Sequence, residues 1–111
     1  DDAIIVIHDD EVSRVTDGKG IVKDLTLGEL KEFNCPDNQK LLTLQEVIDL
    51  CKNKISLQIE LKAEGTPQLV NRLLLKNDIE NEVVITSFDL NLLREIKKLN
   101  TALKVGLLFG E

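Results

Sequence analysis

The chain has 111 residues, an ordinary length for one domain, and 42% of them are hydrophobic, which is enough for a core. Only 3% are aromatic, so the core must be built from Leu, Ile and Val. The formal net charge of −6 argues against a nucleic-acid partner or an anionic membrane surface. No apolar run approaches the roughly 18 residues that a membrane-spanning helix needs.

The two cysteines, Cys35 and Cys51, have neither a CxxC spacing nor a neighbouring histidine. A disulfide between them stays an alternative, but the spacing favours two reduced thiols and no zinc site. No signal peptide is visible, and we therefore expect a cytoplasmic setting.

An apolar run at the start of the chain leads directly into His8, the only histidine. The run predicts a strand over residues 3–8, buried on both faces as in a parallel sheet. Asp9 and Asp10 follow it. The polar stretch 9–25, with its glycines, is too long for a simple connection between two elements.

Two capping-box patterns come next. Thr26 with Glu29 predicts a helix over about 27–33, and Thr43 with Glu46 predicts a second helix that runs to about residue 52. The segment 34–42 between them reads as a loop.

The second half of the chain alternates strands and helices. Residues 55–61 alternate between aliphatic and polar side chains and predict a strand. Thr66 as the cap and Pro67 at the first helical position predict a helix that runs to about Lys76. A strand over 83–86, a helix over 90–99 capped by Ser87 and Asp89, and a strand over 104–109 complete the order.

This order predicts an α/β fold with four parallel strands and helices outside them. Since a TIM-type barrel needs eight strands, four can form only about half of one and would leave two open sheet edges. The chain has no methionine and begins just before a predicted strand. We therefore expect either that it is part of something longer or that a second copy associates through the open edges.

His8 is the first candidate for chemistry. The carboxyl ends of parallel strands are where α/β sheets hold their active sites, and a histidine there can act as acid or base near neutral pH. The alternative is that its ring only hydrogen-bonds the polar loop.

Glu60 and Lys62 are the second candidates, because they share one side of a strand whose other side is aliphatic. A carboxylate can bind a hard cation, and a neighbouring lysine can meet an anion. An edge strand with one solvated side is the alternative. Arg14, Thr16 and the glycines after them could form a phosphate cradle, although the stretch matches neither a P-loop nor GxGxxG. No GxSxG elbow is present, so the sequence gives no support to a serine hydrolase.

Five stretches in this order resemble the glycerophosphodiester phosphodiesterases, and the match runs from His8 to Phe109. They are IHDDEVSRVTDGKGIVKDLTLGEL, LLTLQEVIDL, LQIELK, VVITSFDLNLL and GLLF. The family pattern is close to HD-x(4)-R-x-T-x-G-x-G-x-V-x-D-x-T-L-x-E-L, followed by T-L-x-E-V, E-x-K and S-F-D.

The resemblance implies a (β/α)8 barrel in which residues 1–111 form the central portion, the third to sixth strands. It implies hydrolysis of glycerophosphodiesters to glycerol 3-phosphate and an alcohol, with Ca²⁺ or Mg²⁺ as cofactor. In this picture His8 is catalytic, Glu60 binds the metal, and Lys62 and Arg14 meet the substrate.

The family's H-R-G block, its E-x-D pair and its last two strands have no counterpart here, and Leu42 stands in place of a proline. The chain by itself is therefore expected to be inactive. Two alternatives stay open. One is a non-catalytic binding or assembly domain, and the other is a related phospholipase C or sphingomyelinase D barrel.

Overall fold

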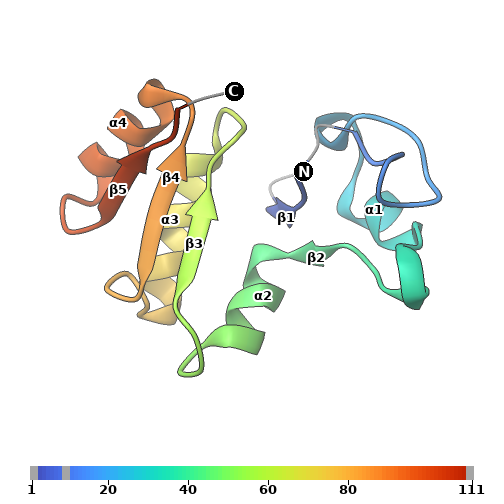
Figure 1. Cartoon of the computed structure of the whole chain (residues 1–111), viewed down its shortest axis with the longest axis horizontal. Helices are drawn as coiled ribbons and strands as arrows, with labels where there is room; N and C mark the ends of the chain where they lie inside the picture. Colours follow the sequence, from blue (N-terminus) through green and yellow to red (C-terminus); the bar gives the residue numbers. More distant parts are fainter. Residues whose placement is uncertain (1–2, 9–10, 110–111) are drawn as a thin grey trace. The chain divides into compact units, whose positions relative to one another are not determined.

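The computed structural model describes residues 3–8 and 11–109. The chain forms two compact units, residues 1–47 (unit 1) and residues 48–111 (unit 2), and each is described by itself (Figure 1). Helix α2 (Leu44–Cys51) begins in unit 1 and ends in unit 2. Its first turn is capped as predicted, because Thr43 Oγ1 accepts from the main-chain N–H of Glu46 at 3.2 Å and Glu46 accepts from Thr43 in return.

Unit 1 contains a two-stranded antiparallel sheet, whereas the sequence predicts that its strand belongs to a parallel sheet. Strand β1 (Ile5–Val6) pairs with β2 (Leu42–Thr43), with Ile5 opposite Thr43. The predicted strand over 3–8 is therefore shorter than expected and runs antiparallel to its neighbour. Val6 is 46% exposed, so the prediction of burial on both faces was also wrong. The physical reason is that β2, at the end of the stretch predicted to be loop, pairs with the main-chain groups of β1 from more than thirty residues away in the chain.

The rest of unit 1 consists of short helical turns around a small core. These are the 3₁₀ turn η1 (Val22–Asp24), helix α1 (Leu27–Glu32) and the 3₁₀ turn η2 (Pro36–Asn38). The predicted capping box of α1 is confirmed, since Thr26 Oγ1 accepts from Glu29 N and the Glu29 carboxylate accepts from Thr26 N. The core is built from Val12, Leu30 and Leu41, with Ile5, Ile7, Val22, Leu25, Phe33 and Cys35 packed against it.

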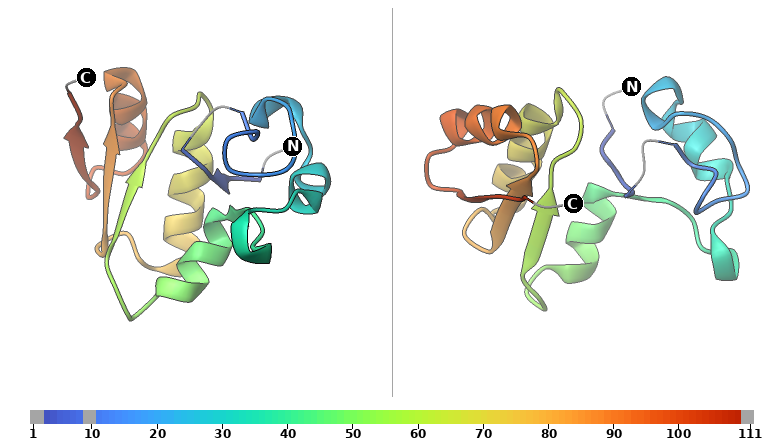
Figure 2. Two further views of the ribbon diagram at one scale, coloured as in Figure 1. Left: turned by 45° about the vertical axis from the view of Figure 1, so that its right-hand side comes forward. Right: turned by 45° about the horizontal axis from the view of Figure 1, so that its top comes forward.

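Unit 2 is a three-stranded parallel sheet in the order β3-β4-β5. The strands are β3 (Leu57–Glu60), β4 (Val83–Ser87) and β5 (Lys104–Leu107). Helices α3 (Thr66–Asn77) and α4 (Leu90–Leu99) connect them and lie on one side of the sheet in both views (Figures 1 and 2). Three of the four strands predicted to be parallel are thus confirmed.

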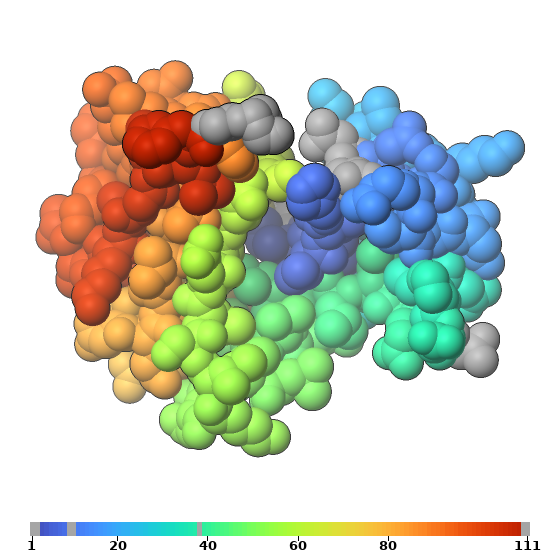
Figure 3. All heavy atoms as spheres, in the orientation of Figure 1, coloured from blue at the N-terminus to red at the C-terminus, as the bar shows by residue number. Residues whose placement is uncertain are grey.

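The strand register divides the sheet of unit 2 into two faces. Ile59 lies beside Ile85, and Ile85 beside Val105, on the face that carries the core under α3 and α4. The other face, which we call the open face, carries Gln58, Glu60, Val84, Thr86, Lys104 and Gly106. Helices α3 and α4 do not cover it, and the strands of unit 2 are seen at the surface in Figure 3.

Smaller differences concern helix ends and thiols. Helix α3 begins at Thr66, and the residue before it is Gly65 in the left-handed region with φ of 81°. The sequence pattern had placed Thr66 itself as the cap. Cys35 and Cys51 are both free thiols, as expected. None of the helices among residues 3–8 and 11–109 is long and apolar enough to cross a membrane.

Candidate active site

Glu60 and Lys62 lie together at the carboxyl end of β3. The ammonium nitrogen of Lys62 is 3.9 Å from a carboxylate oxygen of Glu60, and their side chains are 32% (Glu60) and 35% (Lys62) exposed. A solvated ion pair of this kind adds little to stability. Both groups therefore stay accessible to a ligand, which is what the predicted roles of the two residues require.

The open face beside Glu60 is polar as well. Glu60 stands opposite Thr86 on β4, and Thr86 stands opposite Gly106 on β5. Thr86 is only 6% exposed, and its hydroxyl oxygen lies 3.4 Å from the amide nitrogen of Gln58. At this level of the sheet a carboxylate and a hydroxyl share one face, where a packed barrel usually has branched apolar side chains.

The main chain between Glu60 and Lys62 is held by β4. Leu61 N–H donates to the carbonyl of Thr86 at 2.8 Å, and the hydroxyl of Ser87 donates to the carbonyl of Leu61 at 2.7 Å. The sequence favours a helix cap over a catalytic role for Ser87 and does not predict this contact. The sequence feature that could have indicated this hydrogen bond is a serine at the end of one strand, beside a strand that ends in E-x-K.

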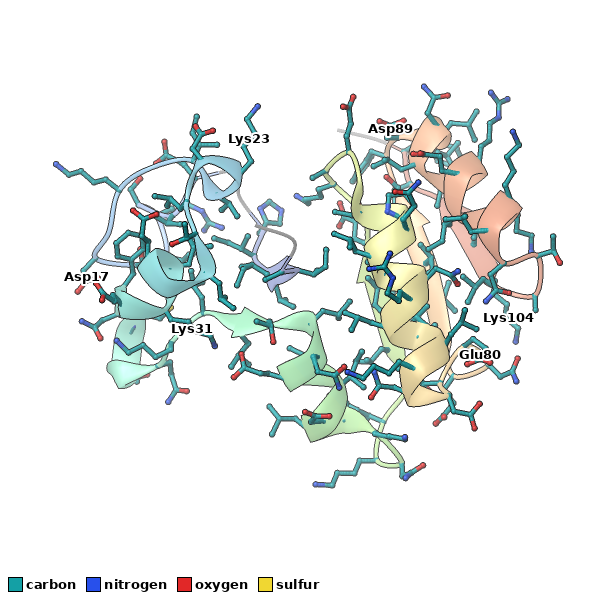
Figure 4. All side chains as sticks on the ribbon, turned by 180° about the vertical axis from the view of Figure 1, so that it is seen from behind. Asp17, Lys23, Lys31, Glu80, Asp89 and Lys104 are labelled. Atoms are coloured by element: carbon teal, nitrogen blue, oxygen red, sulfur yellow. The ribbon has the colours of Figure 1, made fainter. Side chains whose placement is uncertain are left out.

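Asp89 fulfils the capping role that the sequence predicted. Its carboxylate accepts from the main-chain N–H of Asn91 at 2.8 Å at the start of α4 (Figure 4). The Ser87 hydroxyl oxygen also accepts from Asp89 N–H at 2.9 Å. Asp89 is thus a structural residue in unit 2.

His8 is exposed and follows β1 in unit 1. Its neighbours Asp9 and Asp10 lie outside the described residues. The sequence prediction placed His8 on a strand that runs beside the Glu60 strand in the same direction. In the structure β1 pairs antiparallel with β2, and the described strands of the parallel sheet are β3, β4 and β5. The catalytic role of His8 stays a prediction from the family resemblance.

In the loop after His8, the hydroxyl of Thr16 is bonded within the loop itself. The Thr16 hydroxyl donates to the carbonyl of Val12 at 2.9 Å and accepts from Gly18 N–H at 3.0 Å. These groups therefore serve the loop itself. Arg14 is exposed, and its role in substrate binding stays a prediction.

Three carboxylates with lowered pKa values have structural roles in unit 1. The main-chain N–H and the side-chain amide of Asn34 both donate to Asp17 and hold its pKa below the ordinary value (Figure 4). The pKa of Glu29 is lowered by the N–H of Thr26, and that of Glu46 by the Lys31 ammonium and then the N–H of Thr43. None of the three is a candidate for catalysis.

The donor chemistry of Glu60 fits a hard divalent cation, since Ca²⁺ and Mg²⁺ prefer carboxylate oxygens. One of its oxygens lies 3.9 Å from the ammonium nitrogen of Lys62, and the side chain is 32% exposed. Within residues 3–8 and 11–109, no three His, Cys, Asp or Glu side chains gather into a metal-binding group. Glu60 can thus supply one ligand, with the remaining ones coming from water, substrate or other residues.

Comparison with known proteins places the chain in a family. The model of the glycerophosphoryl diester phosphodiesterase family matches residues 1–111. A glycerophosphodiester phosphodiesterase from Caldanaerobacter subterraneus is 34% identical to the chain over 122 aligned positions, which cover 98% of the chain and 50% of that protein.

Solved structures have the same fold. A glycerophosphodiester phosphodiesterase described as putative, from Galdieria sulphuraria, superposes with a TM-score of 0.83 at 27% identity and covers 96% of this chain and 47% of its own. A phosphodiesterase from Oleispira antarctica, solved in complex with the product sn-glycerol-3-phosphate, has a TM-score of 0.77 at 24% identity over 93% of this chain and 47% of its own.

The chain spans about half the length of the curated relatives it matches. The match to the family model covers residues 1–111 and therefore includes the Glu60–Lys62 pair and Ser87 at the end of β4. The chain therefore belongs to the glycerophosphoryl diester phosphodiesterase family.

Proposed function

We propose that this chain is the central portion of a (β/α)8 barrel that hydrolyses glycerophosphodiesters to glycerol 3-phosphate and an alcohol, with a divalent metal ion as cofactor. The observation that carries the proposal is the pairing of Glu60 and Lys62 at the carboxyl end of a parallel strand. Family membership and the names of the curated relatives support the reaction class.

The two charges suit the two parts of a metal–phosphate complex. A phosphodiester carries a negative charge, and the chain's net charge of −6 would repel it in the absence of local cations. Lys62 supplies such a cation at the open face, while Glu60 offers an oxygen ligand to Ca²⁺ or Mg²⁺. A bound cation would offset negative charge on the phosphoryl oxygens.

Proton transfer is assigned to His8. An imidazole can give or take a proton near neutral pH, and bond cleavage at phosphorus needs a proton delivered to the departing alcohol oxygen. Arg14 is proposed to bind the substrate through its guanidinium group, which suits phosphate oxygens. Both assignments rest on the motif that the chain shares with the family.

The proposal also assigns the chain to a barrel, and the sheet of unit 2 supports that assignment. The sheet of unit 2 is parallel, and its open face carries the polar residues, as expected for strands that surround an active site. One histidine and one carboxylate do not make a full set of acid, base and metal ligands. We therefore expect no turnover by the isolated chain.

The test uses a chimera in which the chain replaces the matching half of the Caldanaerobacter relative. The folded chimera should release glycerol 3-phosphate from a deacylated phospholipid, and a chelator should abolish the reaction. The isolated chain should release none. A folded chimera that neither hydrolyses this substrate nor binds glycerol 3-phosphate would favour a non-catalytic binding domain. Preference for intact bilayer lipids would favour the related lipase barrels.

The two edges of the parallel sheet support a further part of the proposal. Within the described residues the sheet ends at β3 on one side and β5 on the other, and an unpaired strand edge is a template for another strand. We propose that the isolated chain associates with a second copy through these edges. Sedimentation of the chain at several concentrations tests this, and a monomer at all of them would contradict it.

A further inference from the structure

We propose that Ser87 is a positioning residue for the Glu60–Lys62 pair, acting through the main chain of Leu61. The inference rests on the proposed function, because it concerns the residues assigned there to the metal ion and the phosphate. It adds to that function a residue that touches neither ligand.

The peptide groups on both sides of Leu61 are fixed by hydrogen bonds to β4. The N–H of Leu61 donates to Thr86 at 2.8 Å, and its carbonyl accepts from the Ser87 hydroxyl at 2.7 Å. The Leu61 side chain is 3% exposed and anchors the same residue in the core. Glu60 and Lys62 are its two neighbours in the chain, so the direction of each side chain depends on how Leu61 is held.

The carbonyl of Leu61 is the part of this arrangement that β-sheet pairing does not satisfy. Strand β3 ends at Glu60, so the Leu61 carbonyl lies beyond the last residue of that strand. The Ser87 hydroxyl donates a hydrogen bond to this carbonyl in place of a main-chain N–H of the neighbouring strand. Because the Leu61 carbonyl belongs to the peptide plane that leads to Lys62, this bond fixes the plane from which the lysine side chain departs.

Ser87 is itself held rigidly. It is 1% exposed, its hydroxyl oxygen accepts from Asp89 N–H at 2.9 Å, and its carbonyl accepts from Leu108 N–H at 2.8 Å. Asp89 in turn caps α4. The hydroxyl thus connects the start of α4 to the end of β3 through one buried side chain.

Removal of the hydroxyl would leave the Leu61 carbonyl and the Asp89 N–H without this partner. An unsatisfied buried group tends to rotate toward water or another donor, and rotation of the Leu61 carbonyl turns the peptide that precedes Lys62. Loss of residues that orient metal-binding side chains commonly weakens metal affinity by about 10- to 100-fold. We expect about a tenfold loss for Ser87→Ala.

The experiment measures Mn²⁺ binding to the folded chimera, in which the Caldanaerobacter half can supply further metal ligands, by paramagnetic broadening of the main-chain amide signals of residues 60–62. Glu60→Gln should abolish the broadening, and Ser87→Ala should weaken the affinity about tenfold. Ser87→Thr keeps the hydroxyl and should restore most of it. Ser87→Cys, a weak donor of similar size, should fall between the two and replaces Ser87→Ala if that variant does not fold.

The matched control is Asn71→Ala, which removes a different hydrogen bond of unit 2, the part-buried 3.2 Å contact from Asn100, the residue after α4, to the buried Asn71 of α3. It should lower stability and leave Mn²⁺ affinity unchanged. Equal affinity losses in Ser87→Ala and Asn71→Ala, or no loss in Ser87→Ala, would overturn the positioning role while leaving the proposed function intact. Unaltered binding in Glu60→Gln, or no binding by the unsubstituted chimera, would overturn the assignment of Glu60 and this inference with it.

Discussion

The ammonium nitrogen of Lys62 lies 3.9 Å from a carboxylate oxygen of Glu60, and each side chain is about a third exposed. At this distance and exposure the attraction between the charges is weak, because water screens it. The pair therefore contributes little to the fold. Removing either charge should affect ligand binding far more than stability.

Lys62→Met should reduce binding of inorganic phosphate to the folded chimera, while the free energy of unfolding changes by less than about 1 kcal/mol. Lys104→Met is the control, because Lys104 lies on the same open face at the amino end of β5 (Figure 4). Calorimetric titration with phosphate measures the effect. Equal losses in the two variants would indicate a general charge effect instead of a site at Lys62.

Glu60→Gln should weaken metal affinity, and high Ca²⁺ should restore part of the lost activity. The amide keeps the size of the side chain but is a poorer ligand for a hard cation than a carboxylate. Activity of the chimera against Ca²⁺ concentration gives the measurement, with Glu82→Gln before the amino end of β4 as control. An unchanged Ca²⁺ dependence in Glu60→Gln would remove Glu60 from the metal site.

His8→Ala should lower kcat of the chimera by about 100- to 10,000-fold and leave KM little changed. The reason is that a general acid or base acts on the transition state and adds little to substrate binding. Steady-state kinetics with a deacylated phospholipid decide the question. Full activity in His8→Ala would show that proton transfer uses another group.

Gly18→Ala should destabilise unit 1 by about 1–3 kcal/mol, because an added methyl group has no space. A Cβ at this position would lie 2.4 Å from Cγ of Phe33, a partly buried side chain that packs against the small core of the unit. Gly28→Ala in α1 is the control, since its Cβ would meet only Thr26 Oγ1 at 3.9 Å. Denaturant unfolding compares the two, and similar stability in both variants would contradict the close packing of Gly18 under Phe33.

Asp17 should make the stability of unit 1 depend on pH. Its pKa in the folded chain lies below the ordinary value of 3.8, because the Asn34 N–H and amide stabilise the charged carboxylate. Its contribution is therefore fully present above pH 3.8, where the carboxyl is also ionised in the unfolded chain, and is lost as the pH falls through the lower folded value. Unfolding at a series of acidic pH values should show a shallower loss for Asp17→Asn than for the unsubstituted chain. Identical pH profiles would contradict this role.

Much of the local structure followed from the sequence because it depends on neighbouring residues. The capping boxes at Thr26 and Thr43 need only a hydroxyl and a carboxylate three residues apart, and both are present. The alternation at Leu57–Glu60 has the period of a strand and correctly separated the core face from the open face. The Glu60–Lys62 pair followed from the same period, since residues i and i+2 of a strand share a side.

The tertiary structure decided what depends on residues far apart in the chain. β1 is paired with β2, antiparallel, because a strand's partner is chosen by packing and main-chain hydrogen bonding across more than thirty residues, and no local pattern specifies it. The packing of Phe33 against Gly18 also depends on residues that are distant in the chain. So does the hydrogen bond from the Ser87 hydroxyl to the Leu61 carbonyl, and no sequence pattern at these residues predicts either contact. Local periodicity thus determined which side chains face the core and which lie on the open face, whereas long-range hydrogen bonds determined how firmly those side chains are held.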